Sequence, residues 1–208
     1  MLECHFMQWR AAARALWAVF AVTCVLYGGF AIAAGSGFVE TGKSRALPLF
    51  FQLHALAGGI ALITGIIQFN TQIRIRFQQA HRWIGRAYVS SAYLASIAAV
   101  INAMFFDVSL AARLSFLLLG FCWFTTTLVA YLTIINGNIA LHREWVLRSF
   151  SLAFFFITFS VWVPVLAGTG NESSAAYFAA VTLSWVSNLL CAEVWIRRRR
   201  TRGDAPTR

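Results

Sequence analysis

Apolar side chains dominate six long stretches of the chain, and polar residues gather between them. A helix that crosses a membrane needs about 20 mostly apolar residues, and each stretch is long enough. The predicted spans cover residues 11–34, 46–69, 83–106, 110–135, 145–167 and 175–196. The pattern therefore predicts an all-α integral membrane protein, a bundle of about six transmembrane helices.

Composition supports a membrane domain over a soluble one. Hydrophobic residues make up 60% of the 208 residues and charged residues only 12%, about half the charged share of a soluble domain. The even spread of apolar stretches favours a single domain over 1–208 with a basic tail at 197–208. The net charge of +10 does not indicate nucleic-acid binding, because the arginines lie between apolar stretches rather than on a basic soluble face.

The distribution of lysine and arginine predicts the orientation, because cytoplasmic loops retain positive charge. With the N-terminus inside, fourteen of the seventeen basic residues fall on the inner side, and only Lys43, Arg45 and Arg113 fall outside. We therefore expect both termini in the cytoplasm. Anionic lipid at the cytoplasmic face is the expected partner of the arginine run 197–200, and a bacterial inner membrane is the expected location.

The first stretch allows an alternative. Arg10 and Arg14, the apolar run and Ala31-Ile32-Ala33 resemble a signal peptide with its cleavage site. The run is about 20 residues long, which exceeds the apolar region of a signal peptide and favours a retained helix. Cleavage would leave five helices in the same orientation.

Acid–base and thiol chemistry have few candidates within the membrane. All seven acidic residues fall at predicted interfaces, loops or tails, which argues against an acid-driven pump. The cysteines form no CxxC pair, so we interpret them as small apolar residues rather than disulfides or metal ligands. They are Cys4, Cys24, Cys122 and Cys191.

Histidine is the more informative residue type. His54 lies two turns into the second stretch, near Gly58, Gly59 and Gly65, which would let another helix or a flat ligand come close. His81 opens the third stretch and His142 precedes the fifth. Both of these histidines are therefore expected on the cytoplasmic side.

His81 and His142 have similar surroundings. Each is followed by an arginine, then a tryptophan, then a second arginine, in HRWIGR (81–86) and HREWVLR (142–148). The 61-residue separation fits duplication of a helix pair. One interpretation is interface chemistry, with tryptophans in the aromatic belt and arginines that reach lipid head groups.

The other interpretation is metal ligation. A helix N-terminus disfavours imidazolium, and neutral imidazole is the form that binds a metal. Two such histidines from neighbouring helices could bind one haem iron from opposite faces. The arginines near these helix starts would suit carboxylates, such as haem propionates, or phosphates. They are Arg74, Arg76, Arg82, Arg86, Arg143 and Arg148, of which the last four would pair with propionates.

Three motifs resemble a known family. HALAGG (54–59), HRWIGRAY (81–88) and HREWVLRSF (142–150) are similar to segments of a family of predicted bacterial membrane proteins, domain of unknown function 2306, over about residues 46–165. More loosely, the chain resembles six-helix b-type cytochromes, which hold two haems between histidine pairs. That resemblance implies one complete site, from His81 and His142, because the fourth stretch offers no histidine to pair with His54.

The leading hypothesis is a membrane protein that binds haem b and acts in electron transfer or redox sensing at the cytoplasmic side, as a component of a membrane oxidoreductase. His81 and His142 would ligate the iron. One rival is a lipid-binding or scaffolding bundle whose His–Arg–Trp motifs fix helix depth. The other is a small-solute transporter with a cavity around Gln52, His54 and Gln68.

Overall fold

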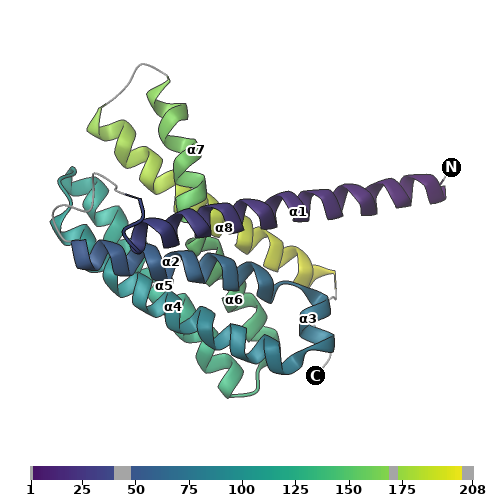
Figure 1. Ribbon diagram of the computed structural model, residues 1–208. Helices are drawn as coiled ribbons and strands as arrows, with labels where there is room; N and C mark the ends of the chain where they lie inside the picture. Colours follow the sequence, from purple (N-terminus) through teal and green to yellow (C-terminus); the bar gives the residue numbers. More distant parts are fainter. Residues whose placement is uncertain (1, 40–47, 169–172, 203–208) are drawn as a thin grey trace.

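The structure, a computed structural model, describes residues 2–39, 48–168 and 173–202. Its helices are α1 (Leu2–Gly35), α2 (Pro48–Gln68), α3 (Thr71–Arg76), α4 (Gln78–Phe105), α5 (Leu110–Ile135), α6 (Ile139–Ala153), α7 (Phe155–Ala167) and α8 (Ser174–Thr201) (Figure 1). Lys43, Arg45 and the end of the basic tail lie outside the described residues, as do the side chains of Cys4 and Arg10.

The described helices account for the predicted spans. Five of them, α1, α2, α4, α5 and α8, are each long and apolar enough to cross a membrane, and α6 with α7 passes the same test as a pair bent by 41°. The prediction of an all-α bundle with about six spans is confirmed. The prediction of one continuous helix over 145–167 is wrong, because the helix ends at Ala153 and a new one starts at Phe155.

Contacts with α8 accompany the bend between α6 and α7. No proline or glycine lies at the break, and Pro164 falls inside α7. Thr158 Oγ1, one turn after the break, accepts a hydrogen bond from Asn188 Nδ2 of α8 at 3.0 Å and lies 3.2 Å from the Ser184 carbonyl oxygen. These polar contacts between α7 and α8 hold the bent segment against its neighbour.

Polar caps set where several helices begin. A side-chain oxygen before α3, α5, α6 and α8 accepts hydrogen bonds from first-turn amides, as N-caps do. These caps are Asn70, Ser109, Asn138 and Ser173. The cap at Asn138 starts α6 before His142, so this histidine lies within the helix. The sequence had predicted it just before the helix, and that prediction is wrong.

Glycines bring α1 and α2 into close contact. A Cβ atom on Gly59 would lie 3.0 Å from the backbone nitrogen of Ile32, so only a glycine fits there without a shift. A Cβ on Gly65 would meet the ring of Tyr88 at 3.0 Å. The expectation that another helix comes close is wrong for Gly58, where a Cβ would meet nothing within 4 Å.

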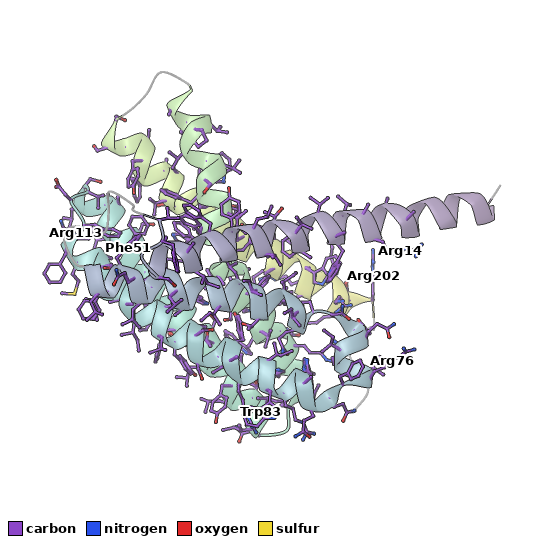
Figure 2. The ribbon with its side chains drawn as sticks, viewed as in Figure 1. Arg14, Phe51, Arg76, Trp83, Arg113 and Arg202 are labelled. Carbon is purple, nitrogen blue, oxygen red and sulfur yellow. The ribbon has the colours of Figure 1, made fainter. Side chains whose placement is uncertain are left out.

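The two ends of the bundle carry different residues. Arg113 and Phe51 lie at one end, and Arg14, Arg76 and Arg202 lie toward the other (Figure 2). On the predicted orientation the second end is cytoplasmic. Between the ends, the buried core includes large aromatic side chains, namely Tyr88, Trp123, Phe150 and Trp185.

Candidate functional site

His81 and His142 occupy equivalent positions at the same end of the bundle. Each is the fourth residue after the helix cap, and its amide bonds the cap carbonyl: His81 to Phe77 at 2.9 Å and His142 to Asn138 at 3.0 Å. Both side chains are partly buried. Seven residues further along each helix, Tyr88 and Ser149 are in direct side-chain contact. The structure thus places the two sequence-predicted ligands at the same end of neighbouring helices.

The two rings differ in their hydrogen bonds. His142 Nδ1 lies 2.8 Å from the Ala130 carbonyl oxygen, and because a carbonyl only accepts, Nδ1 carries the proton and Nε2 keeps its lone pair. His81 Nδ1 is buried and has no hydrogen-bond partner in the described part of the chain. The backbone carbonyl of His81 accepts a bond from Gln68 Nε2 at 2.9 Å, which ties α2 to the start of α4.

His54 lies far from this pair. Its Nδ1 donates to the Ala95 carbonyl at 2.9 Å. Ala95 is fourteen residues along α4 from His81, about 21 Å at ~1.5 Å per residue. His54 therefore belongs to the opposite half of the bundle, where it links α2 to α4.

The four predicted arginines have different environments. Arg148 pairs through two nitrogens with Glu193 of α8 and stacks on Trp145, 4.5 Å from the ring centroid. Arg86 stacks on the exposed Trp83 at 4.8 Å. Arg82 and Arg143 are exposed. Glu144 forms an ion pair with Arg200 of α8. Together with the pair between Arg148 and Glu193, it joins α6 to α8 at this end.

Arg74, and Arg199 of the basic run 197–200, also lie at this end. Burial, together with the charges of Arg143 and Arg199, lowers the pKa of the Arg74 guanidinium. Arg74 interacts electrostatically with His81 as well. Arginines from α3, α6 and α8 thus lie at the same end of the bundle as the histidine pair, the side on which the distribution of charge predicts them.

A buried hydroxyl chain lies two turns along from the histidines. Tyr88 Oη and Ser149 Oγ are 2.7 Å apart, and Ser149 Oγ lies 2.7 Å from Thr127 Oγ1. All three residues are buried. Tyr88 and Ser149 are 61 residues apart. His81 and His142 have the same separation, so the repeated motif, extended by two helical turns, would have predicted this contact.

A family model for predicted membrane proteins, DUF2306, matches residues 51–196. The chain belongs to this family. The match is longer than the stretch of 46–165 that the motifs suggested, because it continues through most of α8. It includes both histidines of the pair, His54 and the hydroxyl chain. Comparisons with curated proteins and with solved structures gave no match.

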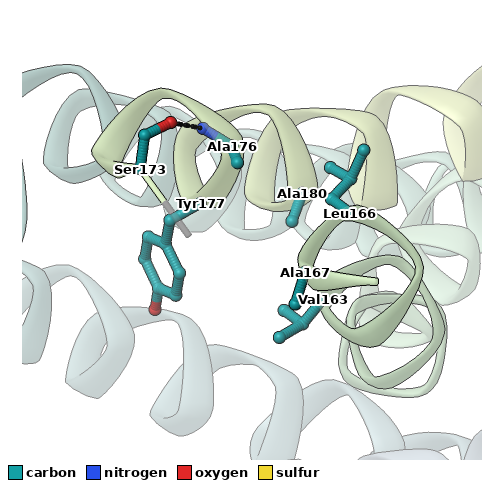
Figure 3. Close-up of a pocket in the computed structure, with 7 residues that line it drawn as sticks. All are labelled: Val163, Leu166, Ala167, Ser173, Ala176, Tyr177 and Ala180. Carbon is teal, nitrogen blue, oxygen red and sulfur yellow. Dashed lines mark hydrogen bonds between the residues drawn. The ribbon is translucent and has the colours of Figure 1, made fainter. Parts of the chain in front are cut away.

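The DUF2306 chain also has an apolar groove near the α7–α8 connection. Its volume is about 190 Å³, and α7 and α8 supply its walls (Figure 3). Its lining residues are Val163, Leu166, Ala167, Ser173, Ala176, Tyr177 and Ala180. This groove lies at the opposite end of α8 from Arg199 and does not include the histidines.

Three or more histidine, cysteine or acidic side chains do not gather at any one point among the described residues of this DUF2306 protein. A protein-only metal centre of that size is therefore not formed in this part of the chain. A haem iron needs only two protein ligands. The histidine pair with its surrounding arginines is the candidate functional site.

Proposed function

We propose that this protein binds haem b at the inner face of a bacterial inner membrane, where His81 and His142 would hold the iron, and serves electron transfer or redox sensing. The observation that carries the proposal is the placement of these two histidines at equivalent helix positions at one end of the bundle. Haem, when bound, would supply a one-electron redox centre. The chain's own residues would supply the ligands and the charges around them.

The hydrogen bonds of the pair fit this role. Metal-ligating histidines usually donate their other ring N–H to a carbonyl or carboxylate, which fixes the tautomer and the ring orientation. His142 has this arrangement, with Ala130 as the acceptor. His81 Nδ1 is buried without a hydrogen-bond partner in the described part of the chain, and it is the nitrogen that we assign to the second bond to iron.

The arginines proposed for the haem propionates fit this role in part. Of these four arginines, Arg148 is already bound to Glu193 and Arg86 stacks on Trp83. Arg82 and Arg143 each follow a histidine of the pair directly and are exposed. Arg82 and Arg143 are therefore the arginines we assign to propionate carboxylates.

Absorbance of the purified protein after haem-replete expression tests this function. The wild type is expected to show the sharp Soret band and split visible bands of low-spin haem. His81→Ala and His142→Ala should each abolish that spectrum, because either leaves the iron one axial ligand short. His54→Ala is the matched control and should keep it, since His54 lies in the other half of the bundle.

Thermal unfolding of the same variants separates loss of haem from loss of fold. The proposal requires folded His81→Ala and His142→Ala proteins that lack low-spin haem. A colourless wild type would contradict it, and so would a spectrum that depends on His54 alone.

A specific observation favours a second function, that of a non-redox bundle that binds anionic lipid. Among the residues that the structure describes, three arginines stack on tryptophans of the inner half: Arg86 on Trp83, Arg148 on Trp145 and Arg199 on Trp195. Trp83 and Trp195 are 60% and 57% exposed. Such pairs suit the membrane interface, where an aromatic ring sits at head-group depth. A folded, colourless protein would favour this function.

The transporter hypothesis gains no support from α2. Gln68 bonds the His81 carbonyl and His54 bonds that of Ala95. The two side chains are fourteen residues apart, about 21 Å along the helix, so they do not share a cavity.

A further inference from the structure

Aromatic rings continue the groove between α7 and α8 toward α5. The ring centroid of Tyr177, which lines the groove, lies 5.8 Å from that of Phe159 and 6.4 Å from that of Phe116 of α5. The Phe116 centroid lies 5.8 Å from that of Phe106, which follows α4 directly. Tyr177 extends from α8 on one side of the groove, and Val163 of α7 lines the other (Figure 3). A chain of ring contacts therefore runs from the groove to the end of α4.

Arg113 of α5 lies at the far end of this chain of rings. Its Nη2 donates a hydrogen bond to the Phe106 carbonyl oxygen at 3.0 Å. Its Nε is buried and has no hydrogen-bond partner in the described part of the chain. No carboxylate of the described residues forms an ion pair with Arg113, and Asp107, the nearest acidic residue along the chain, is exposed. A half-buried guanidinium is costly near apolar side chains unless an anion pairs with it.

Arg113 is close enough to the groove for one molecule to reach both. Ser115, two residues further along α5, has its Oγ 3.0 Å from Thr182 Oγ1 of α8. Thr182 lies two residues beyond Ala180, which lines the groove. Two residues correspond to about 3 Å along a helix, and the axes of packed helices lie about 8–10 Å apart. The acyl chains of one leaflet cover about 15 Å, half of the ~30 Å hydrocarbon core, so a chain whose head group binds Arg113 can enter the groove.

We propose that this groove binds the acyl chain of a long-chain fatty acid whose carboxylate is bound by Arg113. The groove has mainly apolar walls, which suit an acyl chain, and a guanidinium matches a carboxylate in bidentate geometry. A single groove of about 190 Å³ favours a lipid with one chain over a phospholipid with two. On the predicted orientation the site faces the outer leaflet. It lies at the opposite end of the bundle from the histidine pair and does not depend on haem.

Equilibrium binding of radiolabelled hexadecanoate to the full-length protein, purified in a neutral detergent, tests the site. Unlabelled hexadecanoate should displace the label. Hexadecanol, which has the same chain and no charge, should displace it poorly. Equal displacement by the two compounds would overturn the proposal, because the charge would then play no part. Displacement by phosphatidylglycerol at lower concentrations than by hexadecanoate would overturn the choice of a single-chain acid.

Substitutions at the two parts of the site test the head group and the chain separately. Arg113→Gln should weaken binding about 10- to 100-fold, as expected when a hydrogen bond between charged groups is lost. Arg76→Gln makes the same charge change at an exposed position at the other end of the bundle and should leave the affinity unchanged. Ala176→Leu should weaken binding because it fills the groove, whereas Ala175→Leu, at an exposed neighbour outside the groove, should not.

Thermal unfolding of each variant without the fatty acid identifies any variant that does not fold. If Ala176→Leu does not fold, the comparison of Arg113→Gln with Arg76→Gln still decides the proposal. Equal affinity of Arg113→Gln and the wild type for hexadecanoate would overturn it, and so would unchanged affinity of a folded Ala176→Leu protein. The absence of saturable binding to the wild type would overturn it as well.

Discussion

The hydroxyl of Ser149 joins three helices in the middle of the bundle. Each hydroxyl has a single proton to donate. Thr127 donates its proton to the Trp123 carbonyl at 2.7 Å, so Ser149 donates to Thr127, and Tyr88 must then donate to Ser149. The direction of the chain is therefore fixed from α4 through α6 to α5. Ser149 is both an acceptor and a donor in this chain.

Replacing Ser149 by alanine should lower the free energy of unfolding by about 1–2 kcal/mol. The change breaks two buried hydrogen bonds and leaves the Tyr88 donor without its acceptor, which costs about 1–3 kcal/mol in proteins, while interhelical bonds in membranes average about 0.6 kcal/mol. Ser151→Ala is the control, because Ser151 bonds only the Arg148 carbonyl of its own helix at 2.7 Å. Denaturant unfolding in detergent measures both variants. Equal stability of the two would contradict the role of Ser149.

Single residues differ in how much the sequence reveals about them. The repeated motif placed His81 and His142 on one side of the membrane, because their positions relative to the helix starts are local properties. The partner of Arg148 could not be predicted in this way. Glu193 is 45 residues away and on another helix, and only the packing of α6 against α8 brings the two together.

At the scale of helices, two adjacent glycines of α2 have opposite surroundings. Gly59 faces α1, where its Cβ position would lie against the Gly28 carbonyl and the Ile32 backbone. Gly58 has open space at its Cβ position. Small residues allow close approach of membrane helices, but the sequence could not show which of the two neighbours makes the contact.

Alanine at these two glycines should therefore have different effects on stability. Gly59→Ala is expected to cost about 1–3 kcal/mol, because the added methyl forces α1 away from α2. Gly58→Ala should be neutral or stabilising, since alanine is the better helix former. Unfolding in mixed detergent and SDS compares the pair. If Gly58→Ala were as destabilising as Gly59→Ala, the described α1–α2 contact would be wrong.

The bend between α6 and α7 was not visible in the sequence either. An apolar run that is long enough to span the membrane predicts one helix, and sharp kinks usually lie at proline. Here Pro164 lies ten residues beyond the break at Phe154. The break coincides instead with the contacts of Thr158 to Asn188 and to the Ser184 carbonyl, which depend on the tertiary fold.

For the whole molecule, the bent pair decides how many times the chain crosses the membrane. If α6 and α7 together form one span, α8 begins outside and ends inside. If they form a re-entrant loop, α8 begins inside and ends outside. The structure favours one span, because Arg200 at the end of α8 binds Glu144 near the start of α6 at 2.7 Å, so the two ends lie on the same side. The arginines at the end of α8 then also face the cytoplasm, as the positive-inside rule requires.

Reporter fusions at four positions test this topology. Fusions after Gly137, in the turn between α5 and α6, and at the C-terminus should both report the cytoplasm. Fusions after Val108, between α4 and α5, and after Glu172, between α7 and α8, should report the outside. The Glu172 and C-terminal fusions are the decisive pair. A cytoplasmic Glu172 fusion with an external C-terminus would mean that α6 and α7 re-enter, and the arginine run 197–200 would then lie outside. An external fusion after Gly137 would reverse the whole orientation and place the histidine pair at the outer face.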